Sequence, residues 1–159
     1  MRGFLLALLL LGGSAVAQTP GPPGSAVTTV GTGASGQALP MLQSPAFEAS
    51  HVFKASAGNL YSLGVINTGT SGFILLIDGV TVPADGSLTS CGTSNTTGCL
   101  KACYPITAGS PGAPVYGGLQ FQPGPPLPFV NGVVAVFSTS GCNTKTLGGT
   151  TGFFEAQVY

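Results

Sequence analysis

The sequence predicts an all-β protein, an antiparallel β-sandwich or jelly roll of about seven strands. The apolar residues fall in short runs or alternate with polar ones, turn residues separate these runs at regular spacing, and no stretch has a convincing helical period. We expect the β-sandwich domain to span residues 45–159, after a signal peptide over residues 1–17 and a flexible linker over residues 18–44.

Two apolar runs are expected at the centre of this domain. The run from Phe73 to Ile77 is unbroken, too short for a typical helix and bounded by turn residues, which predicts a strand buried on both faces. The turns Asp78-Gly79 and Asp85-Gly86 follow it, because Gly accepts positive φ and Asp can hydrogen-bond its own backbone. A second such strand is expected between Phe129 and Thr139, side by side with the first or facing it.

Other strands are expected on both sides of these runs. Residues 47–55 alternate apolar and polar side chains, with Phe47, His51 and Phe53 on the apolar face, and residues 59–67 form the next strand. Because these two strands and the Phe73 run are close in sequence, we expect an antiparallel meander. Later strands are predicted over 102–107, 115–122 and 153–159, with an irregular proline-rich loop over 122–128.

The N-terminal residues have the pattern of a secretory signal. A positive start at Arg2, an apolar segment over residues 4–11 and the A-x-A pattern over residues 15–17 predict cleavage after Ala17. A membrane anchor is the weaker alternative, since this run is far shorter than the roughly 20 residues that span a bilayer. Residues 18–44 are rich in Pro, Gly, Ser and Thr and predict a flexible arm. We therefore expect an exported protein, periplasmic or extracellular, with no membrane span after signal removal.

Charged side chains are sparse. Without Arg2 the chain keeps three lysines and four carboxylates, a net side-chain charge of −1. Such a chain has no basic stripe for nucleic acid, so nucleic-acid binding is excluded as a function class. The expected partner is another protein or a second copy of the chain.

The four cysteines are Cys91, Cys99, Cys103 and Cys142. An even number behind a signal peptide indicates disulfides, although three pairings are open. We favour Cys91 with Cys99, which closes a polar loop, and Cys103 with Cys142, which joins distant segments. Zinc is the alternative, but paired C-x₂₋₄-C knuckles are missing, and only Cys99 with Cys103 has a compatible spacing. We expect no cofactor.

Catalytic residues are few. His51 is the only histidine, and a hydrolase triad built on it would need a serine nucleophile for which no G-x-S-x-G motif is present. Glu48, Asp78, Asp85 and Glu155 could supply a glycosidase pair, but the two aspartates are explained by their turns. We therefore expect no enzyme, with a hydrolase dependent on His51 as one alternative.

Tyr104 and Tyr116 lie near the proline-rich loops and are the candidate interaction surface. Ordinary half-buried packing is the other explanation for both. If they do form a surface, the second expected function is a secreted carbohydrate-binding or adhesion domain.

Several segments resemble a set of small, mostly uncharacterised proteins encoded by tailed bacteriophages and prophages of proteobacteria, regarded as virion-associated structural proteins. The segments are residues 53–61, 83–86, 103–105, 134–142 and 144–146, within a similarity that spans about residues 47–158. The resemblance implies a non-enzymatic β-rich module, a decoration or fibre component at a virion surface, and supports pairing of Cys103 with Cys142. The signal peptide departs from this pattern and favours display outside a cell.

Overall fold

The structure is a computed structural model that describes residues 31–32, 38–93, 95–121 and 124–159. Its described residues form thirteen strands and no helix, and every pairing between these strands is antiparallel. The all-β prediction is confirmed. The predicted signal peptide over 1–17 and most of the predicted linker over 18–44 lie outside the described residues. Within the described part of the chain, no helix is long and apolar enough to cross a bilayer.

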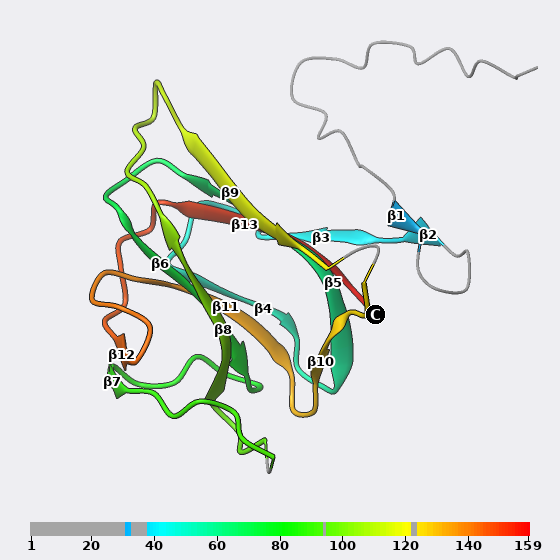
Figure 1. Cartoon of the computed structure of the whole chain (residues 1–159). Helices are drawn as coiled ribbons and strands as arrows, with labels where there is room; N and C mark the ends of the chain where they lie inside the picture. Colours follow the sequence, from blue (N-terminus) through cyan, green and yellow to red (C-terminus); the bar gives the residue numbers. More distant parts are fainter. Residues whose placement is uncertain (1–30, 33–37, 94, 122–123) are drawn as a thin grey trace, which may run out of the picture.

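Two sheets form the body of the molecule (Figure 1). We name the first the covered sheet, and its strand order is β4 (Ser50–Lys54), β11 (Val133–Ser138), β6 (Gly72–Asp78) and β8 (Cys99–Ile106). We name the second the open sheet, with the order β10 (Leu127–Phe129), β5 (Gly58–Asn67), β13 (Gly152–Val158) and β3 (Met41–Gln43), and with β9 (Val115–Gln120) also paired to β5.

One apolar core joins the two sheets. Strands β4, β6 and β11 of the covered sheet and strands β5, β10 and β13 of the open sheet contribute buried side chains to it, among them Ile74, Phe137, Leu63 and Phe154. Successive side chains of a strand point to opposite faces of its sheet, so every second residue faces this core. The two sheets therefore face each other across a shared interior, as in the predicted sandwich.

The two apolar runs predicted at the centre are paired neighbours. Strands β6 and β11 pair along their whole length, from Phe73 opposite Ser138 to Asp78 opposite Val133. Their alternate residues form a second buried cluster on the far side of the covered sheet: Leu75, Ile77, Val134 and Val136, with Leu100 of β8. Both strands are thus buried on both faces, as predicted.

Loops cover this second cluster. The short strands β7 (Gly86–Ser87) and β12 (Thr144–Lys145) pair with each other, and the buried Lys145 ammonium binds the Asp85 carboxylate. Val82, Leu88, Cys103 and Cys142 pack on the cluster. These loops exclude water from the outer face of β6 and β11, which is therefore part of the interior, whereas Val52 on the edge strand β4 is 37% exposed.

The predicted meander is wrong. Strands β4 and β6 do not pair with β5; both pair with β11, which lies between them. The physical reason is that β11 is apolar on both faces and is most fully buried between two neighbours, while β5 crosses to the other sheet. Phe47 also differs from expectation, since β4 begins only at Ser50 and Phe47 is 46% exposed.

Several short strands were not predicted. Strand β3 pairs with β13, with Leu42 opposite Ala156, so the folded domain begins before residue 45. Strand β10 lies partly in the predicted proline-rich loop, and Pro128 is accommodated because β10 is an edge strand. The two-residue strands β1 (Gly31–Thr32) and β2 (Ala38–Leu39) pair within the range of the predicted linker, and β7 and β12 lie outside the predicted strands.

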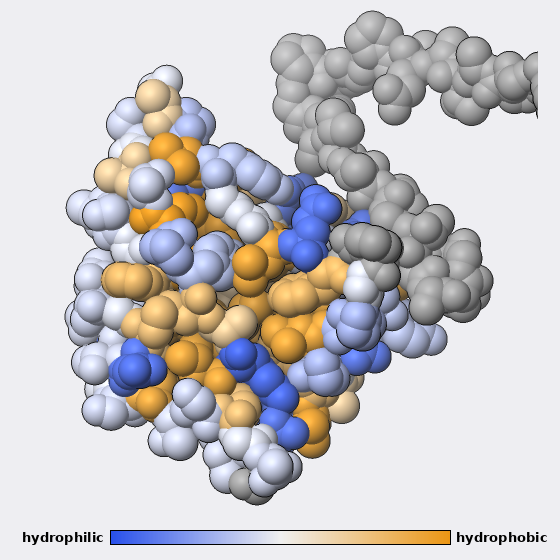
Figure 2. Space-filling model, viewed as in Figure 1, coloured by the Kyte–Doolittle hydropathy of each residue, from blue (hydrophilic) through white to orange (hydrophobic). Residues whose placement is uncertain are grey.

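Apolar surface remains where the edges of the two sheets meet. Figure 2 shows it over the region between β8 and β9. Partly buried side chains from these strands and the following segment pack against the core from this side: Ala102, Tyr104, Leu119, Phe121 and Leu127.

Candidate binding face

The outer face of the open sheet carries the side chains that the core does not use. On β13, Phe154 and Ala156 are buried, so Glu155 and Gln157 lie on the opposite face. The register places Glu155 opposite Gly64 of β5, and Gly64 opposite Gly118 of β9. A carboxylate and two glycines therefore form one row across three strands.

Gly64 leaves space that a side chain from β9 fills. The Tyr116 hydroxyl lies over Gly64 and donates a hydrogen bond of 2.5 Å to Oε1 of Glu155. A Cβ atom on Gly64 would overlap that hydroxyl and would lie 2.7 Å from Oε1 of Glu155. Glycine at position 64 is thus required for the Tyr116 side chain to cross β5.

A pocket of about 570 Å³ lies on this face. Its lining mixes polar and apolar groups and includes Met41, Ser62, Tyr116, Gln120, Glu155 and Gln157, which come from strands β3, β5, β9 and β13. The Ser62 hydroxyl donates to Oε1 of Gln157 at 3.2 Å, and Nε2 of Gln43 donates to Oε2 of Glu155 at 3.5 Å. Hydrogen bonds between neighbouring strands therefore hold several of these polar groups in place.

The Tyr116 hydroxyl is protonated at physiological pH. Burial of the hydroxyl raises the pKa of Tyr116, and the hydrogen bond to Glu155 and its negative charge raise it further, to about 12. The residue as a whole is 63% exposed, so the ring faces solvent while the hydroxyl is held against the sheet. This geometry gives the pocket a rigid aromatic side chain.

Tyr104 does not share this surface. It packs against the main core, and its hydroxyl is buried without a hydrogen-bond partner. Burial raises the pKa of Tyr104 well above its usual range, and nearby Tyr116 raises it further. Of the two tyrosines named from the sequence, the structure places Tyr116 alone on the exposed face.

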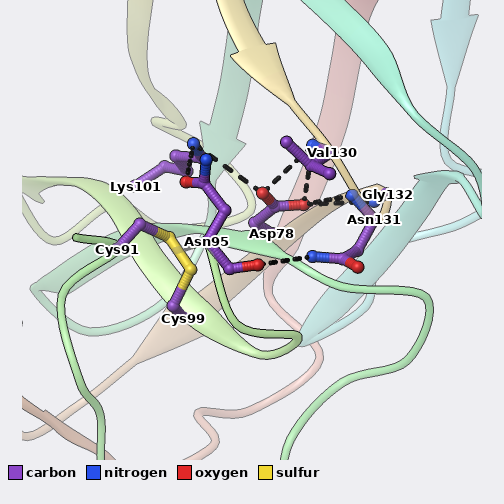
Figure 3. A network of polar contacts seen from close by, with 8 residues as sticks. All are labelled: Asp78, Cys91, Asn95, Cys99, Lys101, Val130, Asn131 and Gly132. Carbon is purple, nitrogen blue, oxygen red and sulfur yellow. Dashed lines mark hydrogen bonds and ion pairs between the residues drawn. A yellow bond between two sulfur atoms is a disulfide. The ribbon is translucent and has the colours of Figure 1, made fainter. Parts of the chain in front are cut away.

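A second cluster of polar groups surrounds Asp78 (Figure 3). The side chain of Asp78 is fully buried and accepts hydrogen bonds of 2.7 to 3.2 Å from the backbone N–H groups of Val130, Asn131 and Gly132. The Lys101 ammonium lies 3.7 Å from Oδ2. Burial alone would raise the pKa of Asp78, but these backbone donors and the Lys101 charge outweigh it, and the pKa is lowered.

The loop closed by Cys91 and Cys99 completes this cluster. Asn95 in that loop accepts a hydrogen bond of 2.6 Å from Lys101 through its side chain and one of 3.0 Å from the Asn131 amide through its backbone oxygen. The arrangement ties three segments together: the loop, β8 and the turn between β10 and β11 (Figure 3). We therefore interpret Asp78 as a structural anchor.

Both favoured disulfides are present, Cys91–Cys99 and Cys103–Cys142. The sulfur atoms of Cys91 and Cys99 and the Asp78 carboxylate lie within 4.8 Å of one another, a spacing that could hold a metal ion. Metal coordination needs thiolates, and these two sulfurs are bonded to each other. The zinc alternative is therefore wrong for the oxidised protein.

His51 lies away from the pocket. Its Nδ1 atom hydrogen-bonds to Oε1 of Glu48 at 2.7 Å, and its ring meets the Phe53 ring edge-on at 4.7 Å between centroids. Neither contact is to a serine or threonine hydroxyl. The geometry gives the hydrolase alternative no support.

Comparisons with protein-family models, with curated proteins and with solved structures find no match to this chain. The resemblance to phage-encoded proteins therefore stays a prediction.

Proposed function

We propose that this protein is an exported, non-enzymatic β-sandwich interaction module that binds its partner through the outer face of the open sheet. The observation that carries the proposal is an asymmetry between the two sheets. Loops and the Cys103–Cys142 disulfide bury the outer face of β6 and β11 in the covered sheet, whereas the outer face of the open sheet keeps a pocket.

The polar groups on the open face are arranged in a way that core packing does not require. Gly64 carries no side chain there, and the Tyr116 hydroxyl takes the space over it while the residue as a whole stays 63% exposed. Fixed aromatic and amide groups of this kind are common at binding surfaces, because little conformational entropy is lost when they meet a partner.

The setting we propose is outside the cytoplasm. The two disulfides indicate an oxidising environment, which supports export. A place on a phage particle, as a decoration or fibre module, is the form of this proposal that follows from the resemblance. In both settings the same face would meet the partner, and the covered sheet would supply the stable frame.

The test is binding of the purified, oxidised protein to the surface of cells of the source organism. The protein carries a fluorescent label at its C-terminus, and Tyr116→Ala is compared with Tyr159→Ala, a change at a tyrosine of nearly equal exposure, 64% against 63%, that does not line the pocket. We expect binding to fall for Tyr116→Ala only. Equal binding by both variants would contradict the proposed face.

A further inference from the structure

We propose that the pocket beside Tyr116 and Glu155 binds a neutral, polyhydroxylated ligand, a segment of an uncharged glycan. This inference rests on the proposed function and names the class of partner for the same face. It is carried by the hydrogen-bonding groups, the charge and the exposed ring of the pocket.

The polar groups of the pocket suit hydroxyls. Gln120 offers amide donors and an acceptor, the Ser62 oxygen can accept, and Glu155 offers acceptors only. A sugar hydroxyl can donate to a carboxylate and accept from an amide at the same time, so neighbouring hydroxyls of one ring can use such a mixed set. The volume of about 570 Å³ lies within the range typical of ligand pockets.

The charge of the pocket argues against an acidic ligand. Glu155 is its only carboxylate, and no lysine or histidine is among the described residues that line it. Two of the three lysines of the described domain are held elsewhere, Lys101 by Asp78 and Lys145 by Asp85. A phosphate, sulfate or uronate group would meet an uncompensated negative charge here, which disfavours anionic polymers.

The Tyr116 ring supplies the apolar part of the site. Its hydroxyl is fixed by Glu155, so the orientation of the ring is set before the ligand arrives. The apolar C–H face of a sugar ring can pack on an exposed aromatic ring while its hydroxyls reach the amides beside it. Preorganisation of this kind reduces the entropy that binding costs.

A protein partner is the main competing occupant. Stable protein interfaces have an apolar centre and bury about 800 Å² on each partner. The centre of this face instead carries a carboxylate, Glu155, and an amide, Gln157, beside Gly64. These features favour the glycan, and the test separates the two occupants.

The first experiment treats the cells before labelled protein is added. Periodate cleaves the vicinal diols of sugars, and proteinase K removes surface proteins. We expect binding that depends on Tyr116 to be lost after periodate and kept after proteinase K. Binding that depends on Tyr116 but is lost only after proteinase K would show that the ligand is a protein. That result would overturn the inference of a glycan ligand and leave the proposed function standing. Binding that does not depend on Tyr116 would overturn both.

The second experiment titrates the ¹⁵N-labelled oxidised protein with neutral hexasaccharides of glucose, mannose, galactose and N-acetylglucosamine, one at a time. We expect at least one to shift the amide signals of Gly64 and Gly118, and Tyr116→Ala to weaken its binding by about tenfold or more. Tyr159→Ala is the control and should bind within about twofold of the parent. Tyr116→Phe keeps the ring, so it should bind better than Tyr116→Ala. If none of the four shifts these signals, the inference is wrong as stated.

Discussion

The hydroxyl of Tyr116 reaches across β5 to Glu155, and the 2.5 Å hydrogen bond joins two strands that do not pair with each other. It can form because Gly64 lies between them. This contact organises the outer face of the open sheet. Changes to Tyr116, Glu155 or Gly64 should therefore have distinct and measurable effects.

Glu155→Gln should lower the pKa of Tyr116 from about 12, because the variant removes the negative charge and replaces a carboxylate acceptor with an amide. The pKa should stay above its ordinary value of 10, since burial of the hydroxyl is the largest cause of the shift. Absorbance at about 295 nm during an alkaline titration measures the change, with Tyr116→Phe identifying the Tyr116 step. An unchanged Tyr116 step in Glu155→Gln would show that the two residues are not coupled.

Gly64→Ala and Gly118→Ala should differ, although both add one methyl group. At Gly64 the new Cβ meets side-chain atoms only, the Tyr116 hydroxyl and Cγ and Oε1 of Glu155, and these side chains can rotate aside. The hydrogen bond should be lost at a cost of about 1 kcal/mol in unfolding free energy.

At Gly118 the new Cβ would lie 2.8 Å from the backbone oxygen of Leu63, which cannot move without disturbing the pairing of β5 with β9. Gly118→Ala should therefore be the more destabilising of the two by urea unfolding. The opposite order would contradict the positions of the two glycines.

Asp78→Asn should destabilise the fold by about 2 to 4 kcal/mol, because an amide nitrogen would face backbone donors and Lys101 would lose its partner. The lowered pKa of Asp78 means that the fold favours the ionised carboxylate. Its contribution to stability is therefore complete above the ordinary pKa of 3.8 and is lost as pH falls below that value.

Urea unfolding as pH falls from about 5 to about 2 measures this dependence. The parent should lose stability over this range, and Asp78→Asn should lose less. Some dependence should remain in the variant, because Lys145 and the Leu147 N–H also lower the pKa of Asp85. Identical pH profiles would refute the anchoring role of Asp78.

The two disulfides should contribute unequally. Cys103 and Cys142 are 39 residues apart, and Cys91 and Cys99 are 8 apart. The chain-entropy relation gives about 4 kcal/mol for the longer loop and about 2.5 kcal/mol for the shorter one. Unfolding of the paired alanine variants, Cys103→Ala with Cys142→Ala and Cys91→Ala with Cys99→Ala, measures both. If removing Cys91–Cys99 lowers the unfolding free energy more than removing Cys103–Cys142, the contacts of the Asn95 loop stabilise the fold more than the difference in chain entropy does.

The local patterns predicted the strands well and their partners less well. The apolar runs at Phe73 and Val133 identify β6 and β11, because only a strand covered on both sides is apolar at every position. The pairing of β4 with β11 joins residues some 80 positions apart, and no local signal encodes it. No local signal predicts β10 either, because this proline-containing segment becomes a strand only by pairing with the edge of β5.

The candidate site was predicted only in part. Amphipathic aromatic side chains suit interfaces, which predicts Tyr116 as a contact residue together with Tyr104, whereas Glu155 is singled out only as one of four carboxylates. The site itself depends on three strands lying in one register, with Gly64 and Gly118 aligned beside Glu155. Because this register is a long-range property, the pocket could be found only in the folded structure.

Site-specific photo-cross-linking tests the central claim, that the open sheet binds and the covered sheet does not. p-Benzoylphenylalanine replaces Gln120, which lines the pocket, or Leu147, which is 42% exposed and lies in the loops over the covered sheet. The labelled oxidised proteins are bound to cells of the source organism and irradiated. We predict cross-linked surface material from position 120 and none above background from position 147. Equal cross-linking from both positions, or cross-linking from position 147 alone, would contradict the account.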